Sequence, residues 1–172
     1  MKDNRKRIKR ITLLALFTSL ALLLSYVEIQ IGPLFTGVPG IKMGLPNIAI
    51  MLVLYRIGTK EAIAVSFIRI IVSTMLLGYG GITALWYSLA GAALSLAVMI
   101  LLKKLDILST LGVSVAGALS HNIGQIIVAM LLMQTTQIGY YMIVLSVTGA
   151  VSGIFVGLAG GYVIQKLAKI EI

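Results

Sequence analysis

The chain has 172 residues, of which 59% are hydrophobic and 11% are charged, and its mean hydropathy is +1.07. A soluble domain has about 25% charged residues, so this composition is typical of an integral membrane protein. The net charge is +9, but six of the 14 basic residues lie within the first ten positions. Basic residues beside apolar spans indicate membrane topology, so a nucleic-acid partner is not expected. The chain has no cysteine, which excludes disulfides and thiolate metal sites.

The first expected element is a membrane helix over residues 11–29, which follows a basic cytoplasmic tail at 1–10. Its apolar part is longer than the core of a usual signal peptide, and no small-x-small cleavage site follows it. We therefore expect a retained first helix. Residues 30–44 contain four glycines and two prolines, which are expected to break the helix. This segment is expected to be an extracellular first loop, and a loop of this length often acts as a lid.

Five further membrane spans are expected at residues 45–57, 60–77, 82–102, 107–133 and 140–167. The span at 45–57 is short, since it would rise only about 20 Å against a hydrocarbon core of about 30 Å. Six spans with a cytoplasmic N-terminus place 12 of the 14 basic residues in the cytoplasm, as the positive-inside rule requires. The sequence therefore predicts an all-α polytopic membrane protein, a single domain over 1–172. It is expected to be a six-transmembrane-helix bundle with both termini in the cytoplasm.

Small residues recur at a spacing of four in two of these helices. They let another helix backbone approach closely. In the last span these residues are Gly149, Gly153, Gly157 and Gly161. In the first span they form two pairs, Ala15 with Ser19 and Ala21 with Ser25. The glycines are expected to pack helices within the chain or to dock a partner, and the pairs in the first span are candidates for docking a partner membrane protein.

One cation is expected inside the membrane. Arg69 lies near the middle of the third span, and an ionisable group there should face a cavity or a partner. Of the five acidic residues, four are expected at the cytoplasmic side, which leaves Glu28 as the acidic partner for Arg69. Two interpretations stay open: a structural pair with Glu28 or with backbone carbonyls, or an anchor for an anionic group of a ligand.

The fifth span carries three hydrogen-bonding side chains in an apolar run. His121, Asn122 and Gln125 are spaced so that all three can converge on one side of the helix. They could fix the bundle by interhelical hydrogen bonds or form the polar wall of a ligand pocket, and we favour the pocket. A metal site is not expected, because the chain has one histidine and no cysteine.

Glu28 and three more residues complete the candidate pocket. Lys42 lies in the first loop and Asn47 follows it, while Trp86 lies towards the outer end of the fourth span. Trp86 could instead belong to the aromatic belt at the membrane interface. No P-loop, Asp-rich pair or Ser-His-Asp set is present, so neither an enzyme nor a cofactor is expected. These absences favour a binding subunit that obtains its energy from a partner.

Several motifs resemble one bacterial membrane-protein family. The resemblance covers residues 11–161, and its motifs are "GVPGIKMGLPNIAIMLVLYRIGTKEAI", "SFIRIIVSTMLLG", "AGAALSLAVMILLKK" and "LGVSVAGALSHNIGQIIVA". The family is labelled heptaprenyl diphosphate synthase component I, or the Gx transporter family. It in turn resembles the S components of energy-coupling factor (ECF) transporters, which are six-helix bundles of similar size.

The resemblance implies a mechanism and a location. An S component in the bacterial cytoplasmic membrane captures its substrate beneath the first loop. It docks through small residues of its first helix on a coupling membrane subunit, which two cytoplasmic ATPases drive. The substrate would be vitamin-like or related to isoprenoids or quinones, and could be anionic. An alternative is a non-catalytic accessory subunit of a prenyl diphosphate synthase system, since five scattered acids cannot form that enzyme's Asp-rich motifs. A solitary small transporter or channel is a third possibility.

Overall fold

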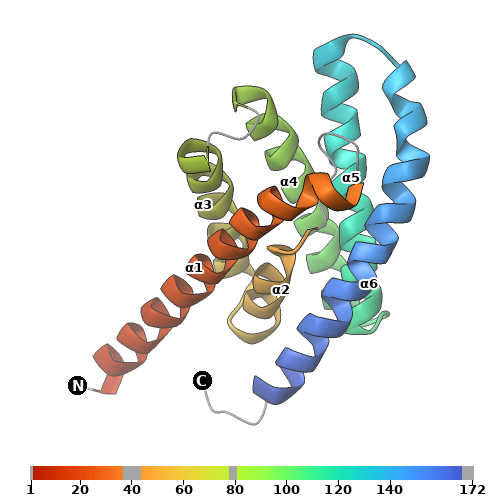
Figure 1. Cartoon of the computed structure of the whole chain (residues 1–172). Coiled ribbons are helices and arrows are strands. Elements are labelled where there is room, and N and C mark those ends of the chain that lie inside the picture. Colours follow the sequence, from red (N-terminus) through yellow and green to blue (C-terminus); the bar gives the residue numbers. More distant parts are fainter. Residues whose placement is uncertain (1, 37–43, 78–80, 168–172) are drawn as a thin grey trace.

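The computed structural model describes residues 2–36, 44–77 and 81–167. These residues form six α-helices and one short 3₁₀ helix, and no strand is found among them. The elements are α1 (Lys2–Thr36), α2 (Asn47–Arg56), α3 (Thr59–Leu77), α4 (Gly81–Leu105), α5 (Thr110–Met133), η1 (Gln137–Tyr140) and α6 (Tyr141–Leu167) (Figure 1). The all-helical fold expected from the sequence is confirmed.

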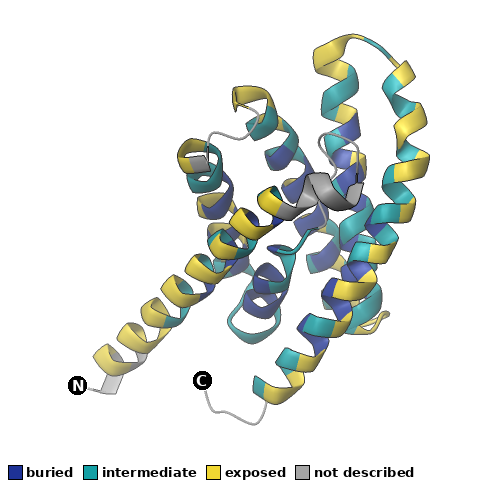
Figure 2. Cartoon of the chain, in the orientation of Figure 1, coloured by how far each residue is buried: buried dark blue, intermediate teal, exposed yellow. Residues whose placement is uncertain are grey.

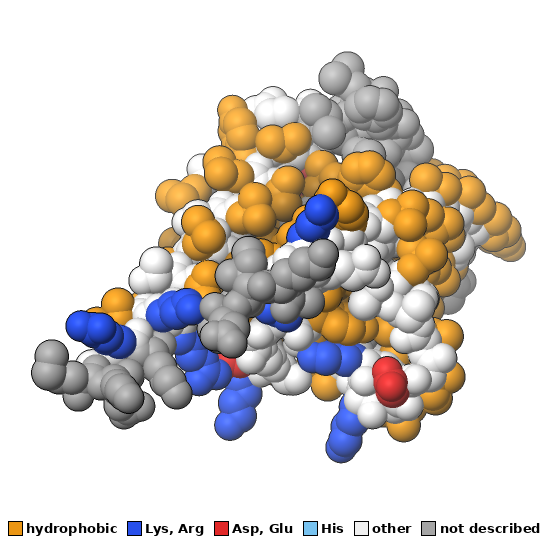
Figure 3. Space-filling view, turned by 90° about the horizontal axis from the view of Figure 1, so that it is seen from below, with side chains coloured by type: hydrophobic (Ala, Val, Ile, Leu, Met, Phe, Trp, Pro, Cys, Tyr) orange, Lys and Arg blue, Asp and Glu red, His pale blue; other side chains and the backbone are white. Residues whose placement is uncertain are grey.

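The helices run alternately up and down in one bundle. The start of α1 and the end of α6 lie at the same end of the molecule, where α2 meets α3 and α4 meets α5 (Figure 1). Lysine and arginine side chains gather on this face (Figure 3). The exposed basic residues of these segments are Arg5, Arg7, Lys9, Arg10, Lys60, Lys104 and Lys166. A single basic end is the pattern that the positive-inside rule describes for a cytoplasmic face.

Four stretches within the described helices are long and apolar enough to cross a membrane. They are Arg7–Gln30, Gly81–Leu105, Thr110–Met133 and Gln137–Leu167. This is consistent with a multi-pass membrane protein. The expected six crossings and the cytoplasmic side of both termini stay predictions.

The short helix α2 lies inside the bundle. Its residues Ala49 to Leu54 are all buried, and the helix packs against α1, α3 and α6 (Figure 2). Its ten residues rise about 15 Å, about half of the hydrocarbon core. A helix that is apolar all round is stable only when other elements surround it. The second expected span is therefore an internal half-length helix that begins in the middle of the bundle.

Glycines allow α4, α5 and α6 to pack with their backbones close together. A Cβ added at Gly153 of α6 would lie 2.8 Å from Val115 Cα, and one added at Gly124 of α5 would lie 2.6 Å from the Ala90 carbonyl oxygen. Gly149, Gly157 and Gly161 of α6 are also buried against α5. The α6 glycines therefore pack helices within the chain.

The first helix is longer than expected. We expected a break after residue 29, but α1 continues over Gly32 and Pro33 to Thr36, and it begins within the basic segment, at Lys2. A proline removes one hydrogen bond from a helix, and Pro33 lies only three residues before the helix end, so the loss is limited. The expected lid at 30–44 is therefore partly helical, and its residues 37–43 lie outside the described part of the chain.

At the basic face, basic side chains donate hydrogen bonds to carbonyls near the C-terminal ends of neighbouring helices. Arg56 Nη2 donates a hydrogen bond to the Leu167 carbonyl at 2.6 Å, and Lys103 Nζ donates to the Leu54 carbonyl at 2.5 Å. The last carbonyls of a helix carry a partial negative charge, so cations there are favourable. Arg10 of α1 also forms an ion pair with Glu61 in the first turn of α3.

Candidate functional site

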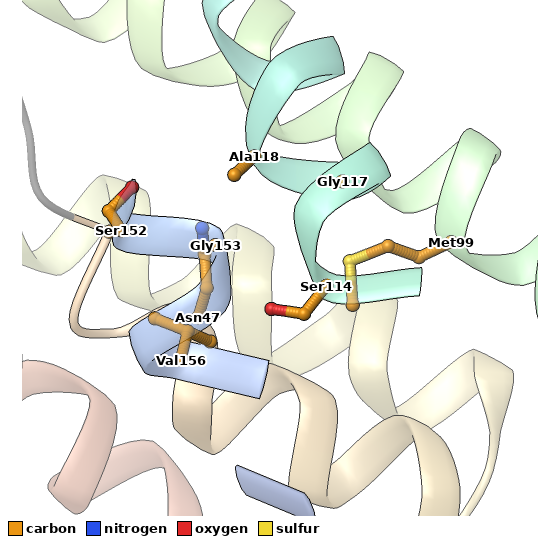
Figure 4. Close-up of a pocket in the computed structure, with 9 residues that line it drawn as sticks. Asn47, Met99, Ser114, Gly117, Ala118, Ser152, Gly153 and Val156 are labelled. Carbon is orange, nitrogen blue, oxygen red and sulfur yellow. The ribbon is translucent and has the colours of Figure 1, made fainter. Parts of the chain in front are cut away.

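A small cavity lies where the N-terminal end of α2 meets α4, α5 and α6. Its lining residues are Gly44, Asn47, Met99, Ser114, Gly117, Ala118, Ser152, Gly153 and Val156 (Figure 4). The cavity exists because α2 begins inside the bundle and because small residues of α5 and α6 leave space beside it. Its volume is about 10 Å³, which is room for about one water molecule.

The cavity is too small for an organic ligand in this structure. Pockets for small organic ligands have volumes of about 300–1,000 Å³. A whole organic molecule therefore enters only if the surrounding helices separate. Without such movement the cavity holds a single oxygen-sized group.

Two hydrogen-bonding side chains point into this space. Figure 4 shows the Ser114 hydroxyl of α5 and the Asn47 amide nitrogen of α2 directed towards it. Ser114 is 4% exposed, and its hydroxyl makes no hydrogen bond with any residue that the structure describes. The Ser152 hydroxyl, by contrast, donates to the Gly149 carbonyl at 3.1 Å. Among the residues that line the cavity none is charged, so the lining is neutral and offers hydrogen bonds.

A buried charge pair lies beside the cavity. Arg69 of α3 is 8% exposed and Glu28 of α1 is 6% exposed, and their side chains interact electrostatically. The Glu28 carboxylate also accepts a hydrogen bond from the Gly44 amide, at a residue that lines the cavity. Arg69 therefore lies near enough to Glu28 to interact with it electrostatically, and Glu28 connects α1 to the start of α2. Arg69 is not a lining residue, although its Nε atom makes no hydrogen bond within the described ranges.

The three polar residues of α5 do not share one wall. His121 and Gln125 face α4, since a Cβ added at Gly91 would lie 2.9 Å from His121 Cε1 and from Gln125 Cγ. Asn122 faces α6, where its Nδ2 donates to the Leu145 carbonyl at 2.5 Å. Neighbouring residues of a helix are about 100° apart, whereas residues four apart are separated by only about 40°. The expected convergence of all three is therefore wrong for Asn122, and none of the three lines the cavity.

Trp86, another expected binding residue, lies away from the cavity. Trp86 is 55% exposed on the outside of α4, and Lys42 lies outside the described residues. Eight residues were expected to bind substrate, and of the seven that the structure describes only Asn47 lines the cavity. Ser114 was not among these eight residues, and neither were the small residues around it. The sequence does contain a signal for this site. Ser114 and Gly117 on α5 and Gly153 on α6 are small residues, and small residues on neighbouring helices can leave a space between them.

The two candidate docking pairs of α1 face opposite ways. Ala21 and Ser25 are buried in the bundle, and the Ser25 hydroxyl donates to the Ala21 carbonyl at 2.9 Å. This pair is therefore not available to a partner, and the expectation that it docks one is corrected. Ala15 and Ser19 are exposed on the outer face of the helix.

Comparison with known proteins gives one match. Residues 17–163 match the family described as heptaprenyl diphosphate synthase component I. No curated protein and no solved structure gives a significant match. The matched range contains every lining residue of the cavity, together with Glu28 and Arg69.

Proposed function

The chain belongs to the heptaprenyl diphosphate synthase component I family, and from this premise we propose that it is the substrate-binding membrane subunit of an ECF-type importer. It captures a small molecule from outside the bacterial cytoplasmic membrane. It passes that molecule to a coupling membrane subunit that two cytoplasmic ATPases drive. The chain itself carries out no reaction.

The cavity is the observation that supports this proposal. It lies in the interior of the bundle, and its lining includes three polar side chains, those of Asn47, Ser114 and Ser152. Polar groups inside a membrane protein are costly unless they are paired or bind something. An internal site at the start of a half-length helix is also the arrangement that membrane transporters use for their substrates.

The exposed pair on α1 is the proposed docking face for the coupling subunit. Ala15 and Ser19 are one helical turn apart and carry small side chains, so another membrane helix can approach closely there. Large apolar side chains lie beside them, including the exposed Leu16 and Leu23.

The description of the family favours a second candidate function. In that role the chain is a non-catalytic membrane subunit of a prenyl diphosphate synthase system. The two functions differ in their partners. An importer binds a coupling membrane protein and ATPases, whereas the alternative binds a soluble prenyl synthase.

Co-purification separates the two candidates. The tagged chain is extracted from bacterial membranes in a mild detergent, and the proteins bound to it are identified by mass spectrometry. We expect a coupling subunit and two ATPases, and we expect Ala15→Leu to remove them because the larger side chain keeps the partner helix away. Ala97→Leu is the matched control, since Ala97 is exposed on α4. A prenyl synthase as the main partner would overturn the importer proposal, and so would substrate uptake into liposomes that contain this chain alone.

A further inference from the structure

The hydroxyl of Ser114 differs from those of two other buried serines, Ser25 and Ser120. Ser25 and Ser120 donate to the carbonyl four residues earlier, at 2.9 Å and 2.6 Å. This back-bond is the usual way in which a helical serine satisfies its hydroxyl. Ser114 is equally buried, yet no such bond is found for it in the described part of the chain, and its hydroxyl points into the cavity (Figure 4). A buried polar group without a partner indicates a missing ligand or water.

The second donor comes from the start of α2. The Asn47 amide nitrogen points into the same space, and its side chain makes no hydrogen bond with the residues described (Figure 4). The backbone amides of Asn47, Ile48 and Ala49 are bonded to the preceding turn, at 2.9, 3.1 and 3.1 Å. They add no further donors, but the N-terminal end of a helix carries a partial positive charge. This end of the cavity therefore favours an oxygen atom that accepts hydrogen bonds.

The surroundings favour an uncharged acceptor. Arg69 interacts electrostatically with Glu28, and the Glu28 carboxylate accepts a hydrogen bond from the Gly44 amide at the edge of the cavity. An anion in the cavity would lie close to this carboxylate without a cation of its own, which is unfavourable in an apolar interior. The remaining lining side chains, such as Met99 and Val156, are apolar.

We infer that the cavity binds an uncharged carbonyl oxygen, borne on an apolar ring or chain, with Ser114 Oγ and Asn47 Nδ2 as the donors. The inference rests on the proposed function only in that the carbonyl compound is the transported molecule. It replaces the expectation that Arg69 holds an anionic group.

Infrared spectroscopy with three probes of similar size tests the inference. The probes are acetophenone labelled with ¹³C at its carbonyl, benzoate and ethylbenzene, each added to the purified full-length protein. A carbonyl that accepts hydrogen bonds has a lower stretching frequency, whereas acetophenone dissolved in detergent keeps its ordinary band. We expect a shifted band that benzoate and ethylbenzene do not displace at equal concentration.

Two variants and a matched control locate the donors. Ser114→Ala should remove the shift and weaken acetophenone binding about fivefold, the usual effect of losing one hydrogen bond. Asn47→Asp keeps the size of the side chain but removes the amide donor, so it should weaken binding at least as much. Ser120→Ala should leave the band unchanged, because that hydroxyl is on the same helix but is bonded to Ala116. Thermal unfolding of each variant verifies that it is folded.

Three results would overturn the inference: no shifted band in the wild type, a band that survives both Ser114→Ala and Asn47→Asp, or tighter binding of benzoate. Failure of the importer proposal looks different. In that case the band depends on Ser114, but no coupling subunit or ATPase is found with the protein. If the importer complex forms and transports while the band is absent, only the assignment of the carbonyl is wrong.

Discussion

The two halves of the bundle are held together by different forces. In the half made of α4, α5 and α6, glycines bring the helix backbones into contact, as at Gly153 and Gly124. In the half made of α1, α2 and α3, charged groups lie between the helices: Arg10 forms an ion pair with Glu61, and the buried Arg69 interacts electrostatically with Glu28. Close packing needs long apolar helices, whereas the half-length α2 leaves polar groups inside that must be paired.

This difference explains where the cavity lies. It forms at the boundary between the halves, where the start of α2 meets α5 and α6. The closely packed half supplies most of the lining residues. The other half supplies Asn47 and, beside it, Gly44. The Gly44 amide donates a hydrogen bond to the Glu28 carboxylate. Substitutions in the two halves should therefore remove different interactions and lower the free energy of unfolding by different amounts.

The largest effect is expected at the buried charge pair. Glu28→Gln leaves the Arg69 guanidinium buried without its counter-charge, which should lower the free energy of unfolding by about 3–5 kcal/mol. Thermal unfolding in detergent measures this loss. The double variant Glu28→Gln with Arg69→Met removes both charges and should recover most of the stability. A single variant as stable as the wild type would show that the pair does not hold α1 to α3.

A smaller loss is expected in the glycine-packed half. Gly153→Val places side-chain atoms against the backbone of α5 at Val115, so the helices must separate, at a cost of about 2–3 kcal/mol. Val151→Leu is the control, because Val151 is exposed on the same helix. The two variants are compared by their Tm. Equal Tm values would mean that α5 and α6 do not pack as described.

The smallest effect is expected at the basic face. Arg10→Ala removes the ion pair with Glu61, and the Arg10 side chain is 58% exposed, so the loss should be below about 1 kcal/mol. Added salt should reduce the difference between the variant and the wild type, because it screens exposed charges. A large loss of stability that does not depend on salt would contradict the description of this ion pair as exposed.

The helices could largely be predicted from the sequence, because apolar runs and their breaks set the bounds. Residues 60–77 were expected for the helix found at Thr59–Leu77, and the difference is one residue. The pairing of Arg69 with Glu28 was one of two interpretations, since few acids lie at that depth. The extent of α1 was missed because a proline near a helix end was taken as a break.

The site was harder to predict, because it depends on which neighbour each helix face meets. The spacing of His121, Asn122 and Gln125 is the same whether these residues face a pocket or other helices. In the structure all three face other helices. Ser114 and Ser120 look alike in the sequence. Only the structure shows that Ser120 has a backbone partner, whereas Ser114 faces a cavity.

Native mass spectrometry of the purified protein tests the central claim most directly. We expect the wild type and the Ser120→Ala variant to retain the same small molecule, and the double variant Ser114→Ala with Asn47→Ala to lose it while staying folded. If the wild type retains no small molecule, or if the double variant retains it equally well, the cavity is not the binding site.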